Sequence, residues 1–244
     1  MKALHKYPES LLRVTNPFCP GCGHGIIYRL IGEVIDELEL REKAIGTVGI
    51  GCSSRAWMQF ECDFASCAHG RAAAVATGIK RARPDNLVFT YQGDGDSLSI
   101  GFSETMYSAI RGENFTQIVV NNTFFAMTGG QMAPTTLEGQ VTVTSPKGRD
   151  TRTTGYPLHV PEMMAGIQNV AFAARVAVDS VPNIRKTKEA IRTAFQKQLD
   201  KKGYSYVEIL SPCSTGLKKT PIAAMEWVTN TLAKEYPLNI YADR

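Results

Sequence analysis

The sequence predicts an α/β fold: a doubly wound, mostly parallel sheet that carries helices on both faces. Short apolar runs rich in β-branched residues alternate along the chain with segments whose apolar residues recur at helical spacing. This alternation is typical of parallel strands that are joined by crossover helices. The composition agrees, because 43% hydrophobic and 20% charged residues are ordinary for a globular protein with a full core. A chain of 244 residues fits one large domain of this class or two small ones.

The predicted elements follow one another in a regular order. Helical spacing marks residues 26–38, 70–82, 102–110 and 184–199. A last helix begins with Thr220 as N-cap and Pro221 at its first position. Strand-like runs occupy residues 44–50, 86–92, 117–122, 174–178 and 204–210.

The segment 126–162 interrupts this order. It is rich in Thr, Gly and Pro and carries few apolar residues. A loop of this length in a compact domain is usually functional, and the alternative is a surface excursion or an arm at a subunit interface. We therefore expect residues 1–244 to form a single domain, with a cysteine-rich loop near 16–25 and a long functional loop near 126–162.

Charge and termini exclude several classes of function. The net charge of +4 is too small to argue for binding of nucleic acid. The basic clusters at 80–83, 201–202 and 218–219 are short, which is typical of solvated surface; docking of an acidic partner is the alternative. The first ten residues lack the apolar core of a secretion signal, and no segment has the roughly 18 apolar residues of a membrane span. We expect a cytoplasmic protein without a disulfide framework.

The motif FCPGCGHG (18–25) contains the pair Cys19 and Cys22. Their spacing fits a redox dithiol, half of a zinc site or half of an iron–sulfur site. Cys52 and Cys213 each follow a predicted strand, so they reach the same edge of the sheet. Four thiolates suit a tetrahedral zinc ion or a [4Fe–4S] cluster, whereas a dithiol would not need Cys52 or Cys213.

Two further polar motifs end at this edge. GDGD (93–96) follows one predicted strand, and Asn121 and Asn122 follow the next. The glycines allow a tight turn and close approach to a phosphate, and Asp94 is a hard oxygen ligand suited to Mg²⁺. In open parallel sheets the carboxyl ends of the strands are where ligands bind. Two unrelated turns are the alternative interpretation.

The pair of motifs resembles the thiamine diphosphate motif, which runs from GDG to an Asn–Asn or Asp–Asn pair nearly thirty residues later. That resemblance implies that Asp94, the Asn122 side chain and the Phe124 carbonyl bind Mg²⁺. A cluster beside such a site has a purpose, since decarboxylation on thiamine leaves an electron-rich species. A structural zinc ion has little reason to be there.

The whole set of motifs resembles the β subunits of 2-oxoacid:ferredoxin oxidoreductases. CPGCGHG, GIGCSSR (49–55), HGRA (69–72), GDGD, VNN and MTGGQMAPTT (127–136) occur in the order seen in that family, across residues 16–216. The resemblance implies thiamine diphosphate, Mg²⁺ and one [4Fe–4S] cluster held by Cys19, Cys22, Cys52 and Cys213. It also implies CoA-dependent oxidative decarboxylation of a 2-oxoacid to acyl-CoA and CO₂, with electrons passed to ferredoxin. Short β subunits of this kind serve branched-chain 2-oxoacids or 2-oxoglutarate.

The matched motifs also imply which residues line the site. His69 is expected to hydrogen-bond the diphosphate or the substrate, or else to make only a local bond. Arg55 is expected to pair with the substrate carboxylate, or else to lie on the surface. His24 is expected to cap or pack the cluster loop, and Cys62 and Cys67 to be free thiols. The expected cofactor contacts are Gly51, Cys52, Ser53, His69, Gly70, Gly93, Asp94, Gly95, Asp96, Asn122, Phe124, Met127 and Thr128.

Thiamine enzymes of the resembled kind place the cofactor between two domains, and the chain has room for only one of them. Residues 1–244 are expected to be the thiamine diphosphate-binding domain that holds the diphosphate half. An α subunit is therefore expected to supply the glutamate that activates the aminopyrimidine, with Glu33, Glu61 and Glu104 as weaker candidates within the chain. The absence of a ferredoxin-type cysteine run predicts separate γ and ferredoxin-like subunits and an external ferredoxin. The alternatives are a non-redox thiamine diphosphate-dependent 2-oxoacid decarboxylase subunit and a zinc-stabilised scaffold protein. Neither nucleic acid nor membrane is expected as a partner.

Overall fold

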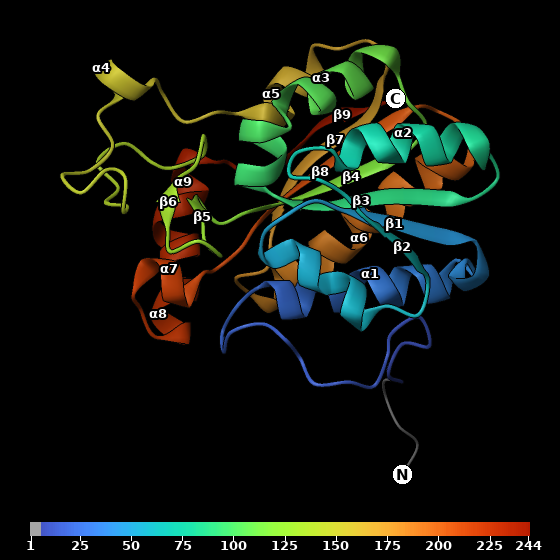
Figure 1. Ribbon diagram of the computed structural model, residues 1–244, viewed down its shortest axis with the longest axis horizontal. Helices are drawn as coiled ribbons and strands as arrows, with labels where there is room; N and C mark the ends of the chain where they lie inside the picture. Colours follow the sequence, from blue (N-terminus) through green and yellow to red (C-terminus); the bar gives the residue numbers. More distant parts are fainter. Residues whose placement is uncertain (1–5) are drawn as a thin grey trace.

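The computed structural model describes residues 6–244 and confirms the predicted α/β fold (Figure 1). Residues 1–5, at the start of the segment that lacks a secretion-signal pattern, lie outside the described residues. Seven strands form one sheet in the order β2-β1-β3-β4-β8-β7-β9. All neighbouring strands are parallel except β7 and β9, which are antiparallel. The strands are β1 (Ala44–Val48), β2 (Asp63–Ser66), β3 (Leu87–Gly93), β4 (Thr116–Asn121), β7 (Val170–Ala177), β8 (Tyr204–Leu210) and β9 (Asn239–Asp243).

Helices cover both faces of this sheet. One apolar core joins the sheet to α1 (His24–Glu37) and α6 (Val181–Leu199). A second core on the other face joins it to α2 (Ala72–Ala82), α3 (Phe102–Arg111) and α5 (Val160–Ala165). Because both faces are covered, every residue of β4, β7 and β8 is buried, which explains their continuous apolar runs.

Shorter elements gather at the carboxyl end of the sheet, and Figure 1 shows β5, β6 and the C-terminal helices at this end of the molecule. Irregular helices follow the strands β1 and β3: the 3-10 helix η2 (Cys52–Gln59) and the π-helix η3 (Asp96–Ile100). The remaining elements are the 3-10 helix η1 (Arg41–Lys43), β5 (Phe124–Phe125), β6 (Gln131–Met132), α4 (Thr151–Thr154), α7 (Ser214–Leu217), α8 (Pro221–Trp227), the π-helix η4 (Val228–Leu232) and α9 (Ala233–Glu235).

The long predicted loop contains an arm, residues 137–158, that extends away from the sheet and carries α4 at its tip (Figure 1). The arm folds around the buried guanidinium of Arg149. Its nitrogens donate to the carbonyls of Pro134 (2.9 Å), Gly155 (3.2 Å) and Tyr156 (3.0 Å), among others. The arm is therefore held largely by hydrogen bonds, to which Arg149 contributes several.

No helix within residues 6–244 has the length and apolar character needed to cross a membrane.

Candidate cofactor site

A pocket lies at the carboxyl ends of β1, β3 and β4, which are neighbours in the sheet. The loops that follow these strands therefore converge at one edge, as the positions of the sequence motifs predicted. Every expected cofactor contact lines this pocket except Gly70. The pocket also has lining residues that were not expected as contacts: His24, Ile50, Phe125 and Ala126.

Asp94 supplies a buried carboxylate to the pocket and is only 1% exposed. Its Oδ2 accepts hydrogen bonds from Thr135 Oγ1 (2.5 Å) and from the backbone N–H of Thr123 (2.8 Å). Burial raises the pKa of Asp94 to about 7, although these hydrogen bonds lower it. A cation bound next to Asp94 would favour the charged form of its carboxylate, so Asp94 is suited to be a ligand of Mg²⁺.

A tight turn after β4 places both Asn122 and Phe124 in the lining of the pocket. Thr123 between them has a φ of +68°, which is rare for a β-branched residue. The turn is held because Thr136 Oγ1 donates to the Thr123 carbonyl (2.6 Å) and Asn122 Oδ1 accepts the Phe124 N–H (3.1 Å). Such backbone conformations persist where the surroundings fix them, and they cluster at binding sites.

The pocket has open space above two of its glycines. A Cβ atom added to Gly51 or to Gly93 would meet no other atom within 4 Å. Both glycines line the pocket, and Gly51 has a φ of +130°. The backbone is therefore open to a ligand that must approach closely, as a diphosphate does. These glycines and Asp94 together fit thiamine diphosphate with Mg²⁺.

Asp96 organises the loops rather than presenting a free carboxylate. It accepts hydrogen bonds from His69 Nδ1, Gln92 Nε2 (2.6 Å) and the backbone N–H groups of Gly70 (2.7 Å) and Ile50 (3.2 Å). Asp96 thereby fixes the His69 ring at the pocket wall and ties together the loops after β1 and β2. Gly70 contributes to this anchoring instead of lining the pocket.

The four cysteines of the expected cluster come from separate segments that pack together. The cysteine loop contacts the segment after β8, since Gly23 N–H donates to the Pro212 carbonyl (3.3 Å) and Ser214 Oγ to that of Pro20 (2.9 Å). A Cβ atom on Gly21 would lie 2.4 Å from Pro221, so only glycine allows this packing.

The four thiols lie close enough to influence one another. Burial raises the pKa of Cys22 to about 12, with smaller contributions from Cys213, Cys52 and Cys19. Burial likewise raises the pKa of Cys213 to about 11. Within residues 6–244, however, no three or more His, Cys, Asp or Glu side chains are already arranged to hold a metal ion. The metal ligands therefore stay predictions, although the chemistry of four soft thiol donors fits an iron–sulfur cluster.

Comparison with known proteins identifies the family. Residues 49–209 match the family described as thiamine pyrophosphate enzyme, C-terminal TPP binding domain. The chain is 36% identical over 204 residues to the 2-oxoglutarate synthase subunit KorB of Methanocaldococcus jannaschii, covering 83% of this chain and 71% of that protein. The chain belongs to the 2-oxoacid:ferredoxin oxidoreductase subunit family. The resemblance found in the sequence motifs is thus confirmed.

This family member has a higher sequence identity to a second relative, which is a longer protein. It is 48% identical over 227 residues to the ketoisovalerate oxidoreductase subunit VorA of Methanothermobacter thermautotrophicus, covering 93% of this chain and 48% of that protein. The chain thus spans about half the length of VorA. In three dimensions it is similar to a 2-oxoglutarate:ferredoxin oxidoreductase from Magnetococcus marinus with 2-oxoglutarate, coenzyme A and succinyl-CoA bound. The TM-score is 0.79 at 26% identity, covering 100% of this chain and 87% of that chain.

The structure places two further side chains of this family member. Arg55, expected either at the substrate carboxylate or on the surface, is exposed and is not among the residues that line the pocket; its Nη1 donates to the Pro17 carbonyl (2.9 Å) in the cysteine loop. His24, expected to cap or pack the cluster loop, stacks on Phe18 in that loop and also lines the pocket. Burial lowers the pKa of His24 to about 4.

Sequence reasoning gave no role to Thr135, which supports the site of this family member through its bond to Asp94. Thr135 and Thr136 belong to the quoted motif MTGGQMAPTT, so the motif was a signal, but only the folded structure shows which groups they bind. Cys62 and Cys67, expected to be free thiols, do not line the pocket.

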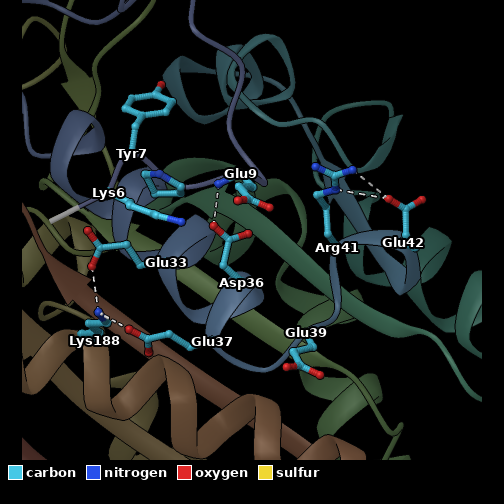
Figure 2. Close-up of a pocket in the computed structure, with 11 residues that line it drawn as sticks. Lys6, Tyr7, Glu9, Glu33, Asp36, Glu37, Glu39, Arg41, Glu42 and Lys188 are labelled. Carbon is cyan, nitrogen blue, oxygen red and sulfur yellow. Dashed lines mark hydrogen bonds and ion pairs between the residues drawn. The ribbon is translucent and has the colours of Figure 1, made fainter. Parts of the chain in front are cut away.

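A second, larger hollow of about 580 Å³ lies beside α1 and is shown in Figure 2. It is lined mainly by acidic side chains, several of which have partners within the protein. Lys188 Nζ contacts Glu33 (2.8 Å) and Glu37 (2.7 Å), and Asp36 accepts the N–H of Glu9 (2.6 Å). These contacts fasten the N-terminal segment and α6 to α1, which gives Glu33, Asp36 and Glu37 a structural role.

Proposed function

We propose that this chain is the thiamine diphosphate-binding subunit of a CoA-dependent 2-oxoacid:ferredoxin oxidoreductase. In this proposal Asp94, the Asn122 side chain and the Phe124 carbonyl hold Mg²⁺. Cys19, Cys22, Cys52 and Cys213 hold one [4Fe–4S] cluster. When bound, thiamine diphosphate supplies the nucleophilic carbon and electron sink for decarboxylation of the 2-oxoacid, and the cluster accepts electrons singly.

The residues of the chain have distinct tasks in this reaction. The loops at Gly51 and Gly93 leave room for the diphosphate, and Asp94 compensates the charge of the metal ion. His69, fixed by Asp96 at Nδ1, is placed to bind the ligand through its other ring nitrogen. Phe124, Phe125 and Met127 form an apolar wall that reduces contact with water.

One observation carries the proposal: the pocket at Asp94 and the group of four cysteines share one edge of the sheet. Cys52 belongs to both, since it lines the pocket and its pKa is raised by burial and by Cys19. A non-redox decarboxylase has no use for four thiols next to the cofactor, and a zinc scaffold has no use for the pocket.

The test is to purify the protein without oxygen, together with its partner subunits, and to measure its metals and activity. We expect about four iron and four sulfide per chain, bound thiamine diphosphate, and dye reduction that requires both a 2-oxoacid and CoA. Stoichiometric zinc without thiamine would support the scaffold instead. Decarboxylation without iron, CoA or electron acceptor would support the non-redox enzyme.

A branched-chain 2-oxoacid is the proposed substrate. No Lys or Arg is among the residues that line the pocket in the described part of the chain, so nothing there pairs with a second carboxylate such as that of 2-oxoglutarate. Ile50, Phe125 and Met127 instead offer apolar surface. The relative with 48% identity is named for ketoisovalerate, which agrees with this surface. We expect kcat/KM for ketoisovalerate to exceed that for 2-oxoglutarate at least tenfold, or ~1.4 kcal/mol.

An α subunit is the proposed partner, because no glutamate lines the described pocket. The weaker candidates within the chain are engaged or lie elsewhere. Glu33 is paired with Arg29 and Lys188, Glu104 is paired with Arg71, and Glu61 is exposed outside the pocket. Electrons would leave through the cluster to γ or ferredoxin-like subunits and an external ferredoxin.

A further inference from the structure

His24 and Tyr91 form a buried pair below the pocket. His24 is the first residue of α1 and is 2% exposed; Tyr91 lies in β3, shortly before Gly93, and is fully buried. Nδ1 of His24 lies 2.5 Å from the Tyr91 hydroxyl oxygen. The imidazole also stacks on Phe18, with ring centroids 4.8 Å apart and an angle of 16° between the planes. Two contacts thus fix the orientation of the ring.

The hydroxyl of Tyr91 determines which nitrogen of His24 carries the proton. The Tyr91 hydroxyl makes no other hydrogen bond within the described residues, so His24 Nδ1 is the available acceptor for its proton. A buried hydroxyl that does not donate is costly. Tyr91 therefore donates to Nδ1, and in the neutral ring the proton of the imidazole lies on Nε2.

The Nε2–H group has no partner within residues 6–244, in a ring that is otherwise buried. His24 lines the pocket together with Asp94, Gly95 and Asn122, so the small accessible part of the ring opens there. A fixed donor at a wall of a pocket suited to a diphosphate and a 2-oxoacid is directed at an anionic acceptor.

We propose that His24 donates a hydrogen bond from Nε2 to an anionic oxygen of the ligand in this pocket, with Tyr91 as the residue that positions it. The acceptor is an oxygen of the diphosphate or of the 2-oxoacid carboxylate. This inference rests on the proposed function for the identity of the ligand. The tautomer itself is a property of the chain alone.

The first test reads the tautomer directly. In the full-length chain labelled with ¹⁵N, long-range proton–nitrogen NMR spectra distinguish a ring protonated at Nε2 from one protonated at Nδ1. The signal of His24 is assigned by its loss in His24→Phe. We expect this signal to show the Nε2–H form in the wild-type chain and a mixture of the two tautomers in Tyr91→Phe. A pure Nδ1–H form in the wild-type chain would overturn the inference.

The second test measures binding in the complex with the partner subunits. We expect His24→Phe, which keeps a ring against Phe18, to weaken either binding of thiamine diphosphate by calorimetry or the KM for the 2-oxoacid at least tenfold. Tyr91→Phe should change the same quantity two- to fivefold, and His159→Phe, away from the pocket, should change neither. A change in cofactor affinity assigns the acceptor to the diphosphate, and a change in KM alone assigns it to the carboxylate.

Iron content separates this role from simple packing of the cluster loop. The inference predicts unchanged iron in Tyr91→Phe and His24→Phe. The inference would be overturned if the variants lost iron and, once iron was restored, bound thiamine diphosphate as tightly as the wild type. It would also be overturned if both variants kept the wild-type affinity for thiamine diphosphate and the wild-type KM. If the wild-type complex itself binds no thiamine diphosphate, the proposed function fails, whereas wild-type binding with unaffected variants rejects only the role of His24.

Discussion

The Asp96 carboxylate accepts a hydrogen bond from Nδ1 of His69, and this contact joins the loop after β2 to the loop after β3. Asp96 is 2% exposed, and its remaining acceptor capacity is used by Gln92 and by backbone N–H groups. The second aspartate of GDGD therefore shapes the pocket, while the first, Asp94, lines it and is the proposed magnesium ligand.

Asp96→Asn should destabilise the protein. One of its oxygens becomes an NH₂ group, which cannot accept the hydrogen bonds that Gln92 and the backbone now donate. Loss of a buried acceptor costs about 1–3 kcal/mol. Urea unfolding should show this decrease in the free energy of unfolding, whereas Asp85→Asn, at an exposed position, should show none. Equal midpoints for the two variants would mean that the Asp96 network does not stabilise the fold.

Asp94→Asn should weaken the binding of thiamine diphosphate with Mg²⁺. The amide keeps an oxygen acceptor for Thr135 but loses the negative charge that compensates the metal ion. We expect affinity to fall at least tenfold, or ~1.4 kcal/mol, in calorimetry on the complex with its partner. Asp63→Asn, exposed in β2, is the matched control. Unchanged affinity in Asp94→Asn would remove Asp94 from the magnesium site.

Cys22→Ser and Cys213→Ser should each lose most of the iron of the anaerobically purified protein, because a cluster needs all four thiolates. Cys62→Ser should keep it, since Cys62 packs against the core instead of the cysteine loop. Iron and sulfide analysis and the visible absorbance of the cluster provide the measurement. A Cys213→Ser protein with full iron content would show that the ligand set is wrong.

Cys62 should react slowly with iodoacetamide at neutral pH. Burial raises the pKa of its thiol to about 12, so at pH 8 the thiolate is about a thousandfold rarer than in an unfolded chain. Peptide mapping by mass spectrometry should show slow modification in the native protein, with a rate that rises with pH toward 12, and fast modification in urea. The raised pKa also makes stability depend on pH. Between about pH 8.5 and 12 the native thiol keeps its proton while the unfolded thiol loses it, so the free energy of unfolding falls as pH rises through that window. Equal rates with and without urea would disprove the burial argument.

The regular core could be predicted from sequence because its residues are buried on both sides. The run YSYVEIL became β8 over the same residues, Tyr204–Leu210. β2 and β9 were missed because they lie at the two edges of the sheet and are partly exposed, so no continuous apolar run marks them.

The parts of the site that lie in short sequence motifs could be predicted. The side-chain positions that depend on contacts between distant parts of the chain could not. Asp94 and Asn122 lie at strand ends, which the alternation of elements locates. The orientation of His24 depends on Tyr91, 67 positions further along the chain, and that of Arg55 on Pro17, 38 positions before it. No local pattern reports such contacts, so the pocket position of His24, and the choice between the two positions considered for Arg55, emerged only from the fold.

The isolated chain should not turn over any 2-oxoacid, even when it is loaded with cluster, thiamine diphosphate and CoA. No glutamate lines the described pocket, and in the proposed function the carboxylate that activates the aminopyrimidine comes from an α subunit. Activity is measured as 2-oxoacid-dependent reduction of a one-electron dye under anaerobic conditions.

Adding the α subunit should restore this activity, and an α subunit whose activating glutamate is replaced by glutamine should not. The cofactor content of the isolated chain is the control, because an empty chain would be inactive for a trivial reason. Glu104→Gln in this chain should leave the activity of the complex close to wild type, since Glu104 is paired with Arg71 and does not line the pocket. Steady turnover by the loaded chain alone would mean that its own side chains complete the site, and the argument for the partner would then be wrong.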